Sequence, residues 1–199
     1  GYWRMNEGAG SIAQDVARNR HLVLPTINNW YFNNINKSVL FNGTSNYLKI
    51  NTGNIPIGIA ESFVIEFWFK GAAQANKATL FSCGHGLLDA QTNDKLSIGF
   101  NQQGLLELNT LGSTYQLSNS NYLDNAWHHF ALNVIRNGSV TAYVDGTAVK
   151  QMAINTIGAL QSDKIVIGAC YYKPVGAITI DDFITESFFK GQIDEVRIW

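Results

Sequence analysis

The chain has 199 residues, of which 46% are hydrophobic and 15% are charged, and its formal net charge is −1. The hydrophobic share is ample for a core, whereas so little net charge gives no field that would attract nucleic acid or an anionic membrane. No apolar run approaches the roughly 18 residues of a spanning helix, so we expect no membrane insertion.

The even texture of the sequence predicts one domain over residues 1–199 rather than two smaller domains. Asn, Ser, Thr, Gln and Gly take the place of charge on the surface, a composition that is common in extracellular β-proteins. The first residues carry no signal peptide, and the last ones stop within a strand pattern. We therefore expect a domain excised from a larger multidomain protein that is secreted or held at a cell surface.

The first part of the chain predicts turns and short strands. Residues 11–20 have the propensity of a short helix, but Gly10 before them and the apolar residues 22–24 after them favour a loop that leads into a strand. The clearest period-two alternation spans residues 62–70. Its apolar face consists of Phe63, Ile65, Phe67 and Phe69, and its mixed, open face consists of Val64, Glu66, Trp68 and Lys70.

The stretch 125–152 predicts a three-stranded meander, because two turn dipeptides, Asn137-Gly138 and Asp145-Gly146, separate runs that favour strands. Both central residues of a two-residue hairpin turn need positive φ, which Asn, Asp and Gly tolerate best. Such a turn at Asn137-Gly138 would pair Val134 with Thr141 and would leave neither face of the meander clearly polar. We therefore expect central strands that are covered on both sides.

Short strands with turn signals between them make up the rest of the chain. They are predicted over residues 39–43, 47–50, 79–83, 96–100, 105–110, 114–117, 164–170 and 192–199, with long loops over 84–95 and 171–187. Many short strands at regular spacing, without a credible long helix, predict an all-β fold of the two-sheet antiparallel sandwich or jelly-roll type.

Two cysteines, Cys83 and Cys170, make no disulfide framework, and neither belongs to a Cys-x-x-Cys pair or a zinc-type cluster. A single disulfide in a secreted protein is one interpretation. Two buried thiols are the other.

Eight strings in the chain occur in the order known from one protein family. They are Trp3-Arg-Met-Asn-Glu-Gly-Ala-Gly, Phe41-Asn-Gly, Phe63-Val-Ile-Glu-Phe-Trp-Phe-Lys, Thr79-Leu-Phe-Ser, Trp127-His-His-Phe-Ala-Leu, Tyr143-Val-Asp-Gly, Ile167-Gly-Ala and Phe189-Lys-Gly-Gln-Ile-Asp-Glu-Val-Arg-Ile-Trp. Over essentially its whole length the chain resembles the laminin-G-like, concanavalin A-like lectin/glucanase jelly rolls, in particular their bacterial surface-protein branch, which is related to the pentraxins. The resemblance implies two stacked antiparallel sheets with the first and last strands adjacent.

The resemblance also implies a structural Ca²⁺ near the joined termini, held between an early loop and the final strand. The matching residues are Asp15, Asn19, Gly43 and Asp194. Carboxylates and carbonyl oxygens from distant segments are what Ca²⁺ requires. Arg18 and Arg20 stand where the family has glycines, so a salt bridge from one of them to a carboxylate is the alternative to the metal.

Catalysis is not expected. Glycoside hydrolases of this fold carry their carboxylates on one strand as Glu-x-Asp-x-x-Glu, and the nearest counterpart runs from Glu61 to Glu66 with Phe63 in the middle position. Residues five apart in a strand point to opposite faces. The adjacent His128 and His129 diverge for the same reason, and no nucleophile elbow accompanies them.

Ligand binding is the function that the resemblance leaves, and we expect a non-catalytic extracellular module for glycan binding or adhesion to a surface glycoprotein. The candidate ligand-binding residues are Glu66, Trp68, His85, Asn93, Asp94, Tyr171 and Tyr172. Aromatic packing and solvated loop acids explain the same residues without a ligand. The alternatives are a structural spacer or protein-docking domain without a small ligand, and an accessory domain of a carbohydrate-active enzyme. In each case the neighbouring domains of the parent chain are expected partners.

Overall fold

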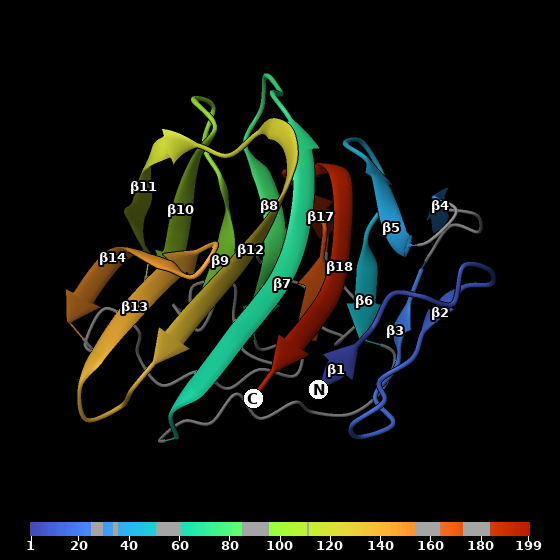
Figure 1. The fold of residues 1–199 in the computed structure, drawn as a ribbon, viewed down its shortest axis with the longest axis horizontal. Coiled ribbons are helices and arrows are strands. Elements are labelled where there is room, and N and C mark those ends of the chain that lie inside the picture. The colour runs from blue at the N-terminus through green and yellow to red at the C-terminus, as the bar shows by residue number, and fades with distance from the viewer. Residues whose placement is uncertain are drawn as a thin grey trace.

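The computed structural model of the chain describes residues 1–24, 30–33, 36–50, 61–84, 96–110, 112–153, 164–172 and 184–199. These residues form strands, turns and bends, and none of the described segments is a helix that could cross a membrane. Two eight-stranded antiparallel sheets lie face to face, with β7 near the centre of the front sheet in Figure 1. The predicted all-β jelly-roll sandwich is confirmed.

The first sheet has the order β14-β13-β12-β7-β18-β5-β4, and β1 also pairs with β18. The bounds of its strands are β1 (Tyr2–Trp3), β4 (Trp30–Asn33), β5 (Asn36–Asn42), β7 (Phe63–Ala72), β12 (Asp124–Val134), β13 (Ser139–Val144), β14 (Thr147–Ala153) and β18 (Lys190–Ile198). Because β1 and β18 are neighbours, the two ends of the chain lie side by side (Figure 1), as expected from the resemblance.

The second sheet has the order β11-β10-β9-β8-β15-β6-β3-β2. The bounds of its strands are β2 (Ile12–Ala13), β3 (Leu22–Val23), β6 (Leu48–Ile50), β8 (Ala78–Gly84), β9 (Leu96–Phe100), β10 (Leu105–Thr110), β11 (Ser113–Asn121) and β15 (Lys164–Ile167). A separate pair consists of β16 (Cys170–Tyr172) and β17 (Ile184–Glu186). Part of the predicted loop over 171–187 is therefore strand, whereas the stretch 11–20 is not helical, as expected.

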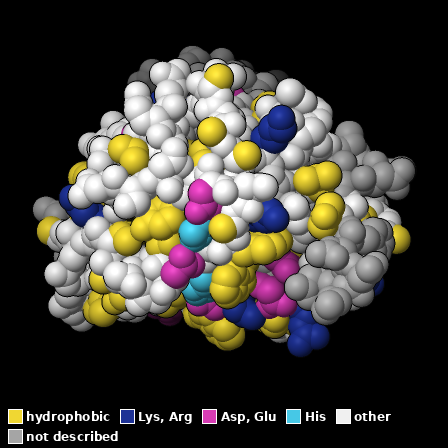
Figure 2. Space-filling model, turned by 45° about the horizontal axis from the view of Figure 1, so that its top comes forward, with side chains coloured by type: hydrophobic (Ala, Val, Ile, Leu, Met, Phe, Trp, Pro, Cys, Tyr) yellow, Lys and Arg dark blue, Asp and Glu magenta, His cyan; other side chains and the backbone are white. Residues whose placement is uncertain are grey.

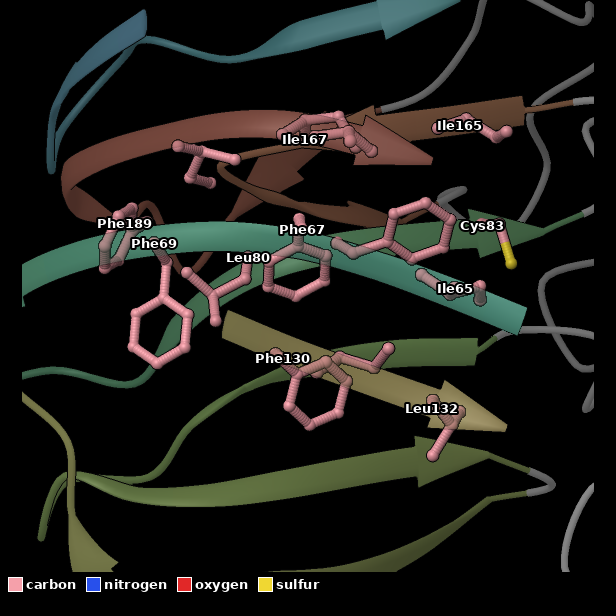
Figure 3. Close-up of a cluster of buried hydrophobic side chains, with 14 of the residues drawn as sticks. Ile65, Phe67, Phe69, Leu80, Cys83, Phe130, Leu132, Ile165, Ile167 and Phe189 are labelled. Carbon is pink, nitrogen blue, oxygen red and sulfur yellow. The ribbon is translucent and has the colours of Figure 1, made fainter. Parts of the chain in front are cut away.

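The core lies between the sheets and follows from the alternation along β7. Phe67 and Phe69 point inward; Phe67 stacks on Phe130 of β12 with ring centroids 5.3 Å apart, and Phe69 meets Phe100 of β9 at 5.5 Å. Figure 3 shows Phe67, Phe69 and Phe130 in one cluster with Leu80 of the opposite sheet. Full burial of each such side chain contributes about 1.5–3 kcal/mol, so the alternating strand anchors both layers.

The predicted register of the first meander hairpin is wrong by one residue. Val134 pairs with Val140, not with Thr141. The N–H of Ile135 donates to the carbonyl of Ser139 at 3.0 Å, so three residues close the loop instead of two. Since side chains alternate with period two, a one-residue shift moves every side chain of a strand to the other face.

The shift also overturns the expectation of strands covered on both sides. Val140, Ala142 and Val144 of β13 are buried, and the residues between them are only half-buried. β12 and β13 thus have one core face and one open face. The second turn is confirmed, because Asp145 and Gly146 have φ values of 51° and 76°.

Candidate functional site

The outward side of the first sheet carries aromatic, acidic and basic side chains over β12, β7, β18 and β1. Alternation along β7 turns every second residue outward. Strand pairing then sets Lys70 beside Trp127, Trp68 beside His129 and Glu66 beside Arg197. We call this surface the open face, and it comprises Tyr2, Glu66, Trp68, Lys70, Trp127, His129 and Arg197.

Two tryptophans of the open face are exposed, Trp68 by 39% and Trp127 by 38%. The indole of Trp68 leans on the imidazole of His129, with ring centroids 5.1 Å apart and planes at 53°. Figure 2 shows apolar side chains beside a row in which acidic and histidine side chains alternate. Exposed large rings next to polar groups make this surface a candidate for ligand contact.

Arg197 holds the polar part of the open face together. Its Nη1 donates to Glu66 Oε1 at 3.2 Å, and its Nη2 donates to Glu195 Oε2 at 2.6 Å. The guanidinium lies 4.5 Å from the ring centroid of Tyr2, whose hydroxyl donates to Glu195. Burial lowers the pKa of Arg197, but hydrogen bonds with Tyr2 and Glu66 outweigh it and raise the pKa overall. These residues thus compensate their own charges and fix one another in place.

Both oxygens of the Glu66 carboxylate face nitrogen atoms. Oε1 also accepts a hydrogen bond from Trp199 Nε1 at 3.1 Å, and Oε2 lies 3.8 Å from His129 Nε2. The carboxylate is therefore held as a hydrogen-bond acceptor on the surface of the sheet.

A clamp around His128 supports the edge of the open face. Its Nδ1 lies 2.7 Å from Asp145 Oδ2 and its Nε2 lies 3.1 Å from Asp124 Oδ1, and Asp145 Oδ1 accepts the backbone N–H of His129 at 2.8 Å. Burial lowers the pKa of His128, but the hydrogen bonds to the two carboxylates outweigh it and raise the pKa overall. A protonated imidazole can donate to both carboxylates at once, so the ring ties the start of β12 to the turn after β13.

Among the side chains that the structure describes, two of the predicted ligand-binding residues, Glu66 and Trp68, share one face. His85, Asn93 and Asp94 lie outside the described residues. The structure describes the backbone of Tyr171 and Tyr172 in β16, beside β8 of the second sheet, but not their side chains.

Sequence reasoning missed Trp127, His129 and Arg197 as site residues. Alternation along β12 and β18 could have placed each on an outward face. Which outward residues meet is set by strand pairing, and for Glu66 and Arg197 the partners are 131 residues apart.

Asp15, the first predicted calcium ligand, is engaged with the backbone. Its Oδ1 accepts the N–H groups of Tyr2 and Ala17 at 2.9 Å each, and its Oδ2 accepts that of Arg20 at 3.3 Å. Burial raises the pKa of Asp15, but these hydrogen bonds outweigh it and lower the pKa overall. The side chain thus fastens its own loop to β1. The other predicted loop ligands, Asn19 and Gly43, lie in tight turns with φ values of 57° and 80°.

Asp194, the second predicted carboxylate ligand, has a different environment. Burial, helped by the charges of Glu195 and Glu7, raises its pKa to about 7. Glu7 has a buried Oε2 without a hydrogen-bond partner among the described residues. An orphaned carboxylate oxygen close to a second acid fits a cation with oxygen ligands. Within the described ranges, however, no three His, Cys, Asp or Glu side chains gather as a metal site.

The two cysteines are buried thiols in the structure and not a disulfide, so the interpretation as a single disulfide does not hold here. Cys83 faces Ile165 across the β8–β15 pair, whereas Cys170 lies five residues farther along, in β16.

The comparisons with known proteins agree with this fold. The model of a laminin G family, described as the concanavalin A-like lectin/glucanases superfamily, matches residues 42–199. The chain belongs to the concanavalin A-like lectin/glucanases superfamily. The resemblance seen in the sequence is thereby confirmed. No curated protein matches in sequence.

Several solved structures share this concanavalin A-like fold. The binding domain of botulinum neurotoxin serotype D has a TM-score of 0.67 and 15% identity, covering 100% of this chain and 47% of its own. The same kind of domain in complex with N-acetylneuraminic acid has a TM-score of 0.66 and 14% identity, with 100% and 46% covered. The chain thus spans about half the length of these toxin domains.

Domain 4 of an extracellular arabinanase from Geobacillus stearothermophilus, in complex with arabinotriose, is also similar. Its TM-score is 0.56 and its identity 18%, covering 100% of this chain and 80% of its own. At such identities the likeness shows a shared fold and carries no residue roles across.

Proposed function

We propose that this chain is a non-catalytic saccharide-binding module of a larger secreted or cell-surface protein, and that the open face contacts the ligand. The observation that carries the proposal is the pair of exposed tryptophans, Trp68 and Trp127, beside fixed polar groups on one sheet. The similar structures support it, because one holds N-acetylneuraminic acid and another arabinotriose.

The chemistry of the open face suits a sugar. Indole rings offer flat apolar surfaces for the C–H side of a sugar ring, and hydroxyl groups both donate and accept hydrogen bonds. Glu66 supplies an acceptor, while Lys70 and His129 supply nitrogen atoms beside Trp127 and Trp68. Because Glu66 is already held by Arg197, its position does not have to be ordered on binding.

The same arrangement argues against hydrolysis. A retaining glycosidase needs two carboxyl groups about 5–5.5 Å apart, with one as nucleophile and one as proton donor. Here Glu66 and Glu195 both accept hydrogen bonds from Arg197, and Glu66 Oε1 also accepts one from Trp199 Nε1. Glu66 and Glu195 are thus both held as hydrogen-bond acceptors on the surface of the sheet.

The proposal is tested by removing one ring. We expect Trp68→Ala to weaken binding to a glycan array at least about tenfold, since one ring contact contributes roughly one factor of ten. Because single sugar modules bind weakly, the array is probed with a multivalent form of the domain. Tyr31→Ala is the matched control, as Tyr31 is also 39% exposed but lies in β4 at the far edge of the same sheet.

If Trp68→Ala and Tyr31→Ala unfold at the same temperature as the wild type, any loss of glycan binding is a local effect of the missing ring. An array without hits for the multivalent domain would contradict the proposal and favour a spacer or protein-docking domain. Release of reducing sugar by the purified domain would contradict the non-catalytic assignment.

A second candidate is an accessory domain attached to a carbohydrate-active enzyme, which the similarity to the arabinanase domain favours.

We also propose a structural Ca²⁺ held by Asp194 with Glu7, because these acids fit a cation better than Asp15, whose carboxylate is already bound to backbone N–H groups. When bound, the ion would neutralise buried carboxylates near the joined termini.

A further inference from the structure

We infer that the open face binds an internal stretch of an oligosaccharide chain, with consecutive sugar rings on Trp127 and Trp68, rather than a single terminal sugar. This inference rests on the proposed function and names the kind of saccharide that the site would take. It follows from the spacing of the rings, from how they are fixed and from the polar groups around them.

The spacing of the two rings is set by the β12–β7 ladder. Trp127 stands opposite Lys70, and His129 stands opposite Trp68, so the tryptophans are diagonal neighbours on one face. The backbone positions of diagonal neighbours in an antiparallel pair lie about 7–8 Å apart, so two linked sugar units can reach both side chains. A single sugar can cover one of the rings, whereas two linked units can cover both.

A bulge brings Trp127 onto this face. The β12–β7 register shifts between Asp124 and Trp127, and Asn125 within the bulge has φ 66°. A bulge adds a residue and re-aims the side chains that follow it. The Asp124 carboxylate accepts the N–H of Ala126 at 2.8 Å, which closes the bulge.

Contacts on the protein side hold the Trp68 ring and the backbone that carries Trp127. The indole of Trp68 rests on His129, and the His128 clamp fixes β12 next to Trp127 by joining Asp124 to Asp145. Groups fixed before binding lose little entropy when a ligand arrives. The Trp68 ring and the strand position of Trp127 are therefore set before a ligand that spans both residues binds.

Polar groups flank the two rings along the strands. Glu66, Trp68 and Lys70 follow one another on the same face of β7. Lys70 lies on the side of Trp68 toward Trp127, and Glu66 lies on the opposite side. Ala131, which pairs with Glu66, keeps the surface low beside the carboxylate. A chain laid across the tryptophans would thus meet a donor at one end and an acceptor at the other.

The test is a length series on one array. It carries linear arabinose, xylose, glucose and galactose oligomers from monomer to tetramer, together with N-acetylneuraminic acid. We expect binding to strengthen from monomer to trimer by roughly tenfold or more, since the second ring is engaged only by linked units. Trp127→Ala should remove most of that gain, whereas the control Tyr31→Ala should keep it.

Trp127→Phe covers the case in which Trp127→Ala fails to fold, because the smaller ring keeps the packing and should give an intermediate gain. A monomer that binds as tightly as its trimer, or a gain that Trp127→Ala leaves intact, overturns this inference while the proposed function stands. The absence of binding to every oligomer and to N-acetylneuraminic acid overturns both.

Discussion

At the scale of single residues, His128 is the most informative titrating group. Both of its ring nitrogens face carboxylates, and its side chain is 12% exposed. Because its pKa is raised in the folded state, its stabilising effect is fully present below the unfolded value of about 6.5. The effect is lost as pH rises through the folded pKa.

We therefore expect the free energy of unfolding of the wild type to fall, relative to His128→Gln, as pH rises from about 6.5 through the raised folded pKa of His128. The neutral amide of this variant cannot titrate there. Urea unfolding of both proteins over a pH series gives the comparison. Curves that stay parallel across this range would show that the clamp does not depend on the imidazolium.

For Asp194 we expect a pH dependence of stability opposite to that of a carboxyl group whose pKa is lowered by folding. Its folded pKa of about 7 lies above the unfolded value of about 3.9, so the native state keeps a proton that the unfolded chain has lost. Stability should fall as pH rises between these values. Asp194→Asn removes that loss, and we expect a gain on the order of 1 kcal/mol above pH 7 without metal, after allowing for solvent screening.

If Asp194 and Glu7 bind Ca²⁺, added calcium should make the wild type more stable than Asp194→Asn. Extracellular sites have dissociation constants of about 0.1–1 mM, so millimolar Ca²⁺ would stabilise the wild type by about 0.4–1.4 kcal/mol. Melting curves in calcium and in chelator, for the wild type and for Asp194→Asn, measure this. Identical wild-type curves in the two solutions would exclude the proposed ion.

At the scale of elements, two turns contain glycines with left-handed φ values. Substituting them separates the cost of backbone strain from the cost of a clash with a neighbouring side chain. Gly146 in the β13–β14 turn and Gly168 after β15 have similar φ values of 76° and 80°. A Cβ on Gly146 would meet nothing within 4 Å, whereas one on Gly168 would lie 2.2 Å from the Phe41 ring.

We expect Gly146→Ala to cost about 1–2 kcal/mol, the strain of a left-handed Cβ. Gly168→Ala should cost about 1–3 kcal/mol more, because the buried ring must also move. Chemical denaturation of the two variants side by side gives the difference. Equal losses would mean that the core around Phe41 yields without cost.

At the scale of the whole molecule, Cys83 lies in β8 of the second sheet and Cys170 in β16 of the separate pair, and the structure has both as buried thiols. We expect two reactive thiols per chain when unreduced protein is unfolded and titrated, and a melting temperature that reductant leaves unchanged. A disulfide closing a loop of nearly ninety residues would contribute about 4–5 kcal/mol. A large drop of the melting temperature in reductant would therefore contradict the structure.

The sequence by itself determined the alternation along β7, the pairing of the first and last strands and the family. It also predicted the Asp145-Gly146 turn. These features depend on residue patterns that are local or carried by family strings. Alternation alone showed that Phe67 points inward and Trp68 outward, because the period of a strand is two.

The tertiary structure decided which outward residues meet. A loop of three residues instead of two reversed the faces of β13, and a bulge set Trp127 beside Lys70. Arg197 reached Glu66 because β18 returns to pair with β7 from the other end of the chain. Register depends on how each loop closes and on the burial of one whole face, and neither can be read from a single strand.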